Sequence, residues 1–302
     1  SSAASDVYKR QMYAEARKAK RRKDLRSGGA TLVVALSDWQ MGNPDGGGIE
    51  SQIAAIVALP DQVTNRLADL RRQKIDVGQV CVAGLGDLHE QCWGFYSYQP
   101  FAVELDRREQ QRVIRRGVFD LCRTVAPQVE KFILTGVGGN HGEGNRQNGK
   151  RVTGANDNDD VAVLEQVGDI LLSNPDTFSN VSVRLPSDRL AISLELSGQI
   201  QAFTHGHLAK MKSGDATKTM WEWWRDQMHG RHYPGVADAT VLTGGHFHHF
   251  NVKEQYERTL FICPSLTNVS AYFGDQKGVR SNPGTLTYVL DPDGWGAMEI
   301  IR

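Results

Sequence analysis

The sequence lacks any long apolar run. The longest, residues 53–59 (IAAIVAL), is stopped by Pro60, whereas a membrane-spanning helix needs about 20 apolar residues. It also lacks an excess of charge, because 35 Lys and Arg residues are balanced by 35 Asp and Glu residues. We therefore exclude a transmembrane protein and a generally polybasic nucleic-acid binder, and any contact with nucleic acid must be local.

Cysteine is also scarce. The four cysteines form no CxxC pair, so neither a disulfide framework nor zinc-finger chemistry is indicated. They are Cys81, Cys92, Cys122 and Cys263. This pattern favours free thiols in a reducing compartment, and we predict a cytoplasmic location without a membrane partner.

The amino-terminal residues need separate treatment. Residues 1–11 (SSAASDVYKRQ) resemble the in-frame translation of a sequencing adaptor, so we interpret them as an artefact, which leaves Met12 or a missing residue as the native start. Residues 12–27 are rich in Ala, Lys and Arg and predict a basic helical arm. A solvated arm is the favoured interpretation, and one that touches a phosphate backbone is the alternative.

The remaining residues, 28–302, predict one α/β domain. Apolar runs at residues 31–37, 79–85 and 131–137 alternate with helical segments ending near residues 74 and 125, which predicts neighbouring, parallel strands. From residue 181 onward short strands dominate, with one helix near residues 217–228. No repeat or low-complexity linker divides the chain.

Five polar clusters follow predicted strands, where open α/β sheets bind ligands. Five of the nine histidines lie in them, beside carboxylates and amides that suit hard divalent ions. The clusters are Asp38-Trp39-Gln40, Gly86-Asp87, Gly139-Asn140-His141-Gly142, Thr204-His205-Gly206-His207 and Gly245-His246-Phe247-His248. Any one of them alone is better explained as a turn or a helix cap. Five together predict a metal site.

The order D-x-Q, GD, GNH, HGH and GHxH resembles the calcineurin-like metallophosphoesterase superfamily, whose usual signature begins with D-x-H. The stretches SDWQMG, GDLHE, GNHGE, NDNDDVAV and FTHGH are similar to a subset encoded by tailed bacteriophages, and the HGH and GHxH pairs resemble the double-strand-break repair nuclease branch. The resemblance implies a four-layer α/β/β/α sandwich of two mixed β-sheets. For a phage-encoded protein the location would be the host cytoplasm.

The resemblance also implies a dinuclear site that hydrolyses phosphoric esters with a hydroxide held between the ions. One ion would be bound by Asp38, Gln40, Asp87 and His248, and the second by Asp87, Asn140, His205 and His246. Mn²⁺ is the favoured metal, and Mg²⁺, Fe²⁺ and Zn²⁺ are alternatives. His141 would stabilise the transition state or protonate the leaving oxygen.

Nucleic-acid phosphodiesters are the leading substrates implied. If the protein is an enzyme, the alternative is a phosphoesterase that acts on nucleotides or cyclic nucleotides. A non-catalytic metal-binding module is a third hypothesis, against which the presence of His141 argues, because a structural metal site has no use for a catalytic histidine.

Two positions depart from the superfamily pattern. Gln40 replaces a histidine, and because an amide oxygen is a harder, weaker ligand than imidazole, the first ion should bind less tightly. His89 could substitute, but we expect it beside the ligands. Gly142 replaces an acid that orients the catalytic histidine, a role that Glu143 could take. His207 is also expected beside the ligands.

Two further groups have structural interpretations. Trp221, Trp223 and Trp224 are predicted to pack in the core rather than to stack on bases. Residues 156–160 (NDNDD) are predicted to cap the following helix rather than to shape a substrate cleft.

Overall fold

The computed structural model describes residues 2–21, 25, 29–94, 99–143, 146–147, 150–210, 214–267 and 282–302. Arg22, Lys23 and Arg26 of the predicted basic arm lie outside the described residues. No helix in the described ranges is long and apolar enough to cross a membrane.

The first sheet has six strands in the order β13-β12-β1-β2-β3-β6. Strands β1, β2, β3 and β6 are parallel, and β12 and β13 run antiparallel to their neighbours. Their bounds are β1 Ala30–Leu36, β2 Val77–Gly84, β3 Lys131–Gly136, β6 Val181–Arg184, β12 Thr285–Asp291 and β13 Gly294–Ile301. The parallel order predicted for the first three strands is confirmed.

The second sheet has five strands in the order β10-β11-β9-β8-β7. Strands β8, β9 and β11 are parallel, and the two edge strands are antiparallel. Their bounds are β7 Ala191–Leu196, β8 Gln199–Thr204, β9 Val241–Gly244, β10 Asn251–Gln255 and β11 Arg258–Ile262. Both sheets are therefore mixed, as the resemblance implied. A separate small ribbon pairs β4 (Arg146–Gln147) with β5 (Lys150–Arg151).

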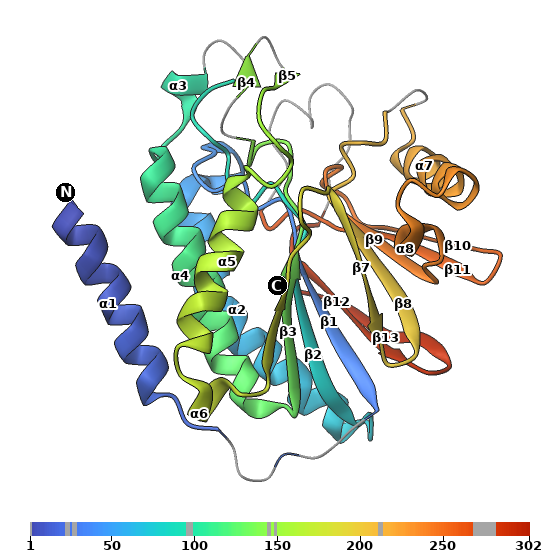
Figure 1. Ribbon diagram of the computed structural model, residues 1–302, viewed down its shortest axis with the longest axis horizontal. Coiled ribbons are helices and arrows are strands. Elements are labelled where there is room, and N and C mark those ends of the chain that lie inside the picture. The colour runs from blue at the N-terminus through green and yellow to red at the C-terminus, as the bar shows by residue number, and fades with distance from the viewer. Residues whose placement is uncertain are drawn as a thin grey trace.

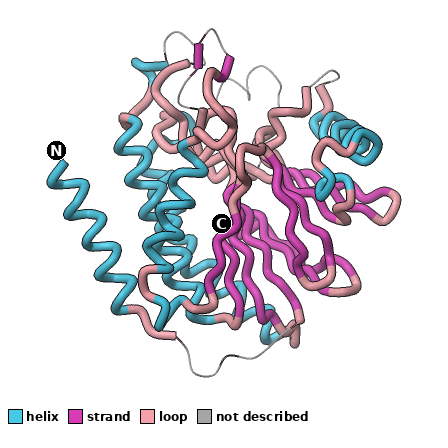
Figure 2. The backbone as a smooth tube through the Cα atoms, viewed as in Figure 1, coloured by secondary structure: helices cyan, strands magenta, loops and turns pink. Residues whose placement is uncertain are grey.

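Helices cover the outer face of each sheet (Figure 1). Against the first sheet lie α2 (Gly48–Arg72), α4 (Arg107–Val125) and α5 (Asp159–Leu172), and on the second lie α7 (Ala216–Gly230) and α8 (Pro234–Ala237). Figure 2 shows the same order of layers, helix, strand, strand and helix. The shorter elements are α3 (Gln99–Ala102), α6 (Pro175–Phe178), η1 (Asp45–Gly47) and η2 (Ala126–Gln128). The four-layer sandwich is confirmed.

Three apolar clusters fill the three interfaces between these layers. Successive side chains of a strand point to opposite faces, so Leu32 and Val34 of β1 pack under the helices while Val33 and Ala35 pack between the sheets. This two-sided burial explains why β1 is a continuous apolar run. The third cluster lies between the second sheet and α7 and includes Trp221 and Trp224. Core packing of these two tryptophans is confirmed.

Helix α1 (Ser2–Lys18) corrects the prediction for the basic arm. The helix includes most of the residues set aside as an adaptor artefact and ends at Lys18 rather than continuing to Arg26. Only part of the arm is solvated, because Met12 and Ala16 are fully buried against the outer helical layer whereas Arg17 and Lys18 are exposed. Glu15 also forms an ion pair of 2.8 Å with Arg116 of α4. Apolar contacts on one face of α1 therefore dock it on the domain, and Figure 1 shows this helix alongside the outer helical layer.

Candidate metal centre

The five predicted polar clusters meet at one edge of the two sheets. In the first sheet, Asp38 and Gln40 follow β1, Asp87 follows β2, and Asn140 and His141 follow β3. In the second sheet, His205 follows β8, and His246 and His248 follow β9. Because all five strands are parallel within their sheets, their carboxyl ends bring together residues more than 200 positions apart.

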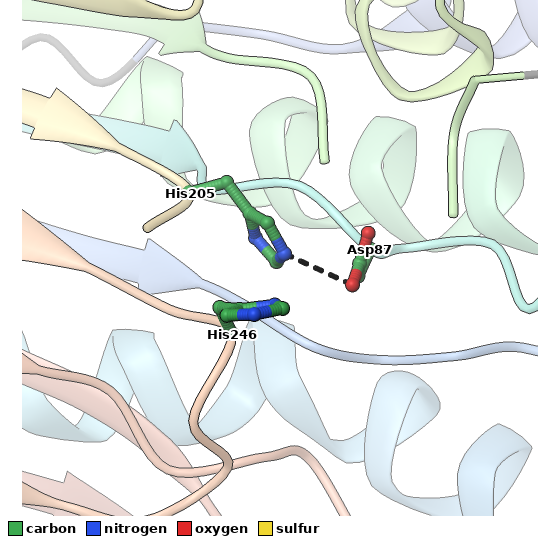
Figure 3. A group of neighbouring side chains, drawn as sticks. All are labelled: Asp87, His205 and His246. Atoms are coloured by element: carbon green, nitrogen blue, oxygen red, sulfur yellow. Dashed lines mark ion pairs between the residues drawn. The ribbon is translucent and has the colours of Figure 1, made fainter. Parts of the chain in front are cut away.

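Asp87, His205 and His246 form the centre of this group (Figure 3). Each offers one ligand atom, and these atoms lie within 4.8 Å of one another. The His205 Nε2 atom is 2.9 Å from the Asp87 carboxylate and 3.1 Å from the Asn140 Oδ1 atom. The other ring nitrogen, Nδ1, donates to the Leu85 carbonyl at 2.7 Å. This bond fixes the ring so that Nε2 faces the group, as a metal ligand requires.

Asp38 lies beside this centre and faces two histidines from the second sheet. The His248 Nε2 atom is 3.3 Å from the Asp38 carboxylate. The backbone N–H of His246 donates to the same carboxylate, at 3.0 and 3.1 Å from its two oxygens. The Ser37 hydroxyl donates to it as well. Asp38 is buried, so it places a second carboxylate where the first ion was predicted.

His141 is held at both its backbone and its ring. Its N–H donates to the Asp87 carboxylate at 2.7 Å, and its Nδ1 donates to the Glu90 carbonyl at 2.9 Å. The Glu90 carboxylate lies 3.6 Å from the same Nδ1. The Nε2 atom lies 3.5 Å from the Gln40 amide nitrogen, and the side chain is 15% exposed. His141 therefore presents Nε2 at the site.

Five of the seven predicted ligands have a left-handed backbone. Their φ angles are +52° for Asp38, +42° for Gln40, +51° for Asp87, +72° for His246 and +59° for His248. This conformation is uncommon for residues other than glycine, although Asp, Asn and His adopt it more readily than most. Such strain is concentrated at functional sites, where the surrounding structure fixes it.

Burial and opposite charges shift the site's pKa values apart. Burial alone would raise the pKa of Asp87, but His205 and His141 outweigh it and hold that pKa below its ordinary value. Burial alone would lower the pKa of His205, but Asp87 raises it to about 9. Burial, with the charge on His205, lowers the pKa of His246 to about 4 and that of His207 to about 3. Divergent shifts of this kind are typical of functional sites.

Three residues predicted beside the ligands have distinct surroundings. His89 is fully buried, with Nδ1 2.8 Å from the Asp160 carboxylate. The His207 ring lies 5.3 Å from the His205 ring and 6.3 Å from the His246 ring. Glu143 forms an ion pair of 3.0 Å with Arg146, and the orienting contact with His141 that was suggested for it is made by Glu90. Gly142 has no room for an acid, because an added Cβ would lie 2.4 Å from Asp160.

Sequence reasoning missed two of these carboxylates, Glu90 and Asp160. Glu90 stands in the GDLHE stretch, three residues after Asp87. The sequence does not show that it lies near His141, about 50 positions away. Asp160 was assigned with residues 156–160 to a helix cap. That prediction is confirmed for Asn158, whose side chain accepts the Asp160 N–H at 3.0 Å. Asp160 itself turns toward the metal-site loops.

No family model matches this chain, and no curated protein matches it. Among solved structures the chain is similar to a predicted phosphoesterase from Streptococcus pneumoniae, with 12% identity over 87% of this chain and 84% of that one and a TM-score of 0.35. It is similar to Vps29 complexed with zinc from Entamoeba histolytica, with 12% identity over 89% and 96% and a TM-score of 0.39. An archaeal phosphodiesterase gives 12% identity over 89% and 99% and a TM-score of 0.37. Likenesses this weak establish neither a family nor a function.

Proposed function

We propose that this protein is a metal-dependent phosphoesterase of the calcineurin-like metallophosphoesterase superfamily that hydrolyses phosphodiester bonds. The proposal rests on the convergence of Asp87, His205 and His246, with ligand atoms within 4.8 Å, beside His141. Carboxylates, imidazoles and an amide are the ligand types of a two-metal site. The fixed ring of His205 and the buried carboxylate of Asp38 fit this use.

Two ions have distinct ligand sets in this proposal. Asp38, Gln40 and His248 would hold the first and Asn140, His205 and His246 the second, with Asp87 shared. Bound ions would supply an acidified water and positive charge for the phosphoryl oxygens. The oxygen-rich set that includes Gln40 favours Mn²⁺ over Zn²⁺.

The chain's own residues account for the remaining chemistry. Burial alone would lower the pKa of His141, but Asp87 and Glu90 raise it above its ordinary value. With Nδ1 engaged by the Glu90 carbonyl, Nε2 is the ring atom that can carry a proton to the site. His141 would donate this proton to the leaving oxygen. This arrangement also argues against a non-catalytic module, which needs no such proton donor.

Nucleic acid is the proposed substrate because a basic ribbon borders the site. Arg146 of β4 donates to the Asn140 carbonyl at 3.2 Å, and β5 adds exposed Lys150 and Arg151. Arg146 and Arg151 are direct partners across the ribbon, and Glu143 forms an ion pair with Arg146. The exposed side chains of Lys150 and Arg151 would contact phosphates on either side of the scissile bond. A nucleotide or cyclic nucleotide would need fewer of these charges.

A hydrolysis assay in Mn²⁺ tests the proposal. We expect the wild type to cleave bis-p-nitrophenyl phosphate and labelled DNA or RNA, and Asp87→Asn to lose nearly all activity and part of its bound metal. An asparagine Oδ1 can still accept the His141 N–H, so circular dichroism should show an intact fold. Full activity in Asp87→Asn or in chelator-treated wild type would refute the metal mechanism.

A second comparison separates the two substrate classes. Lys150→Glu combined with Arg151→Glu should slow cleavage of the polymer far more than that of bis-p-nitrophenyl phosphate. It should also reduce the salt dependence of polymer binding, by about one unit of slope for each phosphate that the protein no longer neutralises. Equal effects on both substrates would favour the small-molecule alternative.

A further inference from the structure

Asp160 is a buried carboxylate that joins the two loops bearing the candidate ligands of the first sheet. It lies in the first turn of α5 and has no exposed surface. Its Oδ2 atom accepts the N–H of Asp87 at 2.9 Å and that of Gly139 at 3.1 Å. Its Oδ1 atom accepts the N–H of Leu88 at 3.1 Å, the N–H of His89 at 3.3 Å and the His89 ring at 2.8 Å. Each carboxylate oxygen of Asp160 therefore accepts at least two hydrogen bonds.

These bonds fix a backbone conformation that the loops would not adopt without them. The donors lie in the loop after β2, which carries Asp87, and in the loop after β3, which carries Asn140. Asp87 has φ of +51°, and Asp160 binds the N–H of this same residue. A left-handed aspartate is strained and persists only where its surroundings over-determine it, and the bond from Asp160 is part of that determination.

The Asp160 and Asn158 side chains pack closely against Gly142. An added Cβ at Gly142 would lie 2.4 Å from the Asp160 Oδ2 and 2.2 Å from the Asn158 Oδ1. The Asn158 amide donates to the Gly139 carbonyl at 2.9 Å, so the same helix end binds both polar groups of Gly139. Loss of the carboxylate would leave several buried N–H groups without their partner.

We propose that Asp160 is the positioning residue of the metal centre, which holds Asp87 and Asn140 at the separation that the two ions require. The inference rests on the proposed function, because it assumes that these two side chains bind metal. The bonds from Asp160 to Asp87 and Gly139 go to backbone N–H groups, so it acts through the backbone of the two loops. Residues that orient metal ligands in this way typically contribute 10- to 100-fold to metal affinity.

Asp159 provides a matched control. It stands next to Asp160 in the same first turn of α5, so both carboxylates interact alike with the helix dipole. Its partners are side chains, because it binds the Arg107 guanidinium at 2.6 and 2.7 Å, the Gln111 amide at 2.9 Å and the side-chain amide of Gln91 in the loop after β2. Asp159→Asn therefore tests the loss of a buried acid at this helix end without changing the hydrogen bonds to the loop backbone.

The experiment measures Mn²⁺ binding directly by isothermal titration calorimetry, with no substrate present. We expect Asp160→Asn to weaken Mn²⁺ binding by about 10- to 100-fold, and Asp159→Asn to stay near the wild-type affinity. Saturating Mn²⁺ should restore part of the hydrolysis rate in Asp160→Asn. Wild-type affinity in Asp160→Asn, or an equal loss in Asp159→Asn, would overturn the proposal.

A second variant decides the question if Asp160→Asn does not fold. Gly142→Ala keeps every hydrogen-bonding group but pushes against the Asp160 carboxylate, so it should also weaken Mn²⁺ binding. Unchanged binding in that variant would overturn the proposal. A wild type that binds no Mn²⁺ at all would instead refute the metal site, and with it this role of Asp160, which distinguishes the two failures.

Discussion

Gly86 offers a direct test of how closely the candidate metal loops must approach. Its φ is +85°, and an added Cβ would lie 2.5 Å from the Gly139 nitrogen and 2.6 Å from the Gly139 Cα. Both atoms belong to the backbone, so no side chain can rotate to make room. The same Cβ would lie 2.9 Å from the His205 Nδ1 atom, which is bonded to the Leu85 carbonyl. Gly86→Ala must therefore separate the two loops.

The size of the effect follows from these distances. Real Cβ contacts are essentially never shorter than 3.0 Å, so the loops after β2 and β3 must move apart by roughly half an ångström, which is about the positional tolerance of a functional site. Because a misplacement of about 1 Å can cost 100-fold in rate, we expect Gly86→Ala to lower hydrolysis by about 10-fold or more.

Gly214→Ala separates this clash from backbone strain. Gly214 has a similar φ of +71°, but an added Cβ there would meet nothing within 4 Å. Both variants pay about 1–2 kcal/mol for a left-handed alanine, whereas only Gly86→Ala displaces the metal loops. Thermal unfolding, Mn²⁺ titration and hydrolysis of bis-p-nitrophenyl phosphate should be measured for both. If Gly86→Ala kept the wild-type rate and Mn²⁺ affinity, the close approach of the loops would not matter for function.

Three further predictions concern single side chains. His141→Ala should lower the rate by about 10²–10⁴-fold for poor leaving groups with metal content unchanged; loss of bound metal, measured by elemental analysis, would make His141 a ligand instead. The activity of Gln40→His should saturate at a lower Mn²⁺ concentration than that of the wild type and should tolerate Zn²⁺ better. Identical curves of activity against Mn²⁺ for the two proteins would show that Gln40 is not a metal ligand. Met12→Ala should destabilise the protein by about 2–5 kcal/mol, or less if α1 undocks locally. Substitution of the exposed Arg17 by alanine is the control. If thermal unfolding gave the same melting curve for Met12→Ala and the wild type, α1 would not be docked.

Much of the fold could be predicted because its signals are local. Residues buried on both faces produce continuous apolar runs, and these located β1, β2 and β3 to within two residues. The candidate site could be predicted for a related reason, since parallel strands bring their carboxyl ends to one edge. Asp38, Asp87 and His205 each follow such a strand, so their meeting depends on topology rather than on details of packing.

The remaining features depend on contacts between distant segments. Strand β10, with the sequence NVKEQ, is a polar edge strand with little burial, so it lacks the apolar signal. Propensity predicts that residues 12–18 are helical but not that Met12 docks on the outer helices. The roles of Glu90 and Asp160 likewise depend on neighbours about 50 and 70 positions away, and nothing in their local sequence distinguishes them from a turn residue and a helix cap.

The left-handed backbone at the candidate ligands limits how this site can change during evolution. Aspartate, asparagine, histidine and glycine tolerate this conformation best, whereas β-branched residues are true outliers there. At Asp38, Asp87, His246 and His248, therefore, most replacements would incur a folding penalty in addition to any loss of chemistry. A mutational scan should find these positions intolerant even when selection acts only on protein abundance. Gln40 is not among the favoured residue types, and among residues that keep a ligand atom its backbone accommodates aspartate, asparagine and histidine most easily.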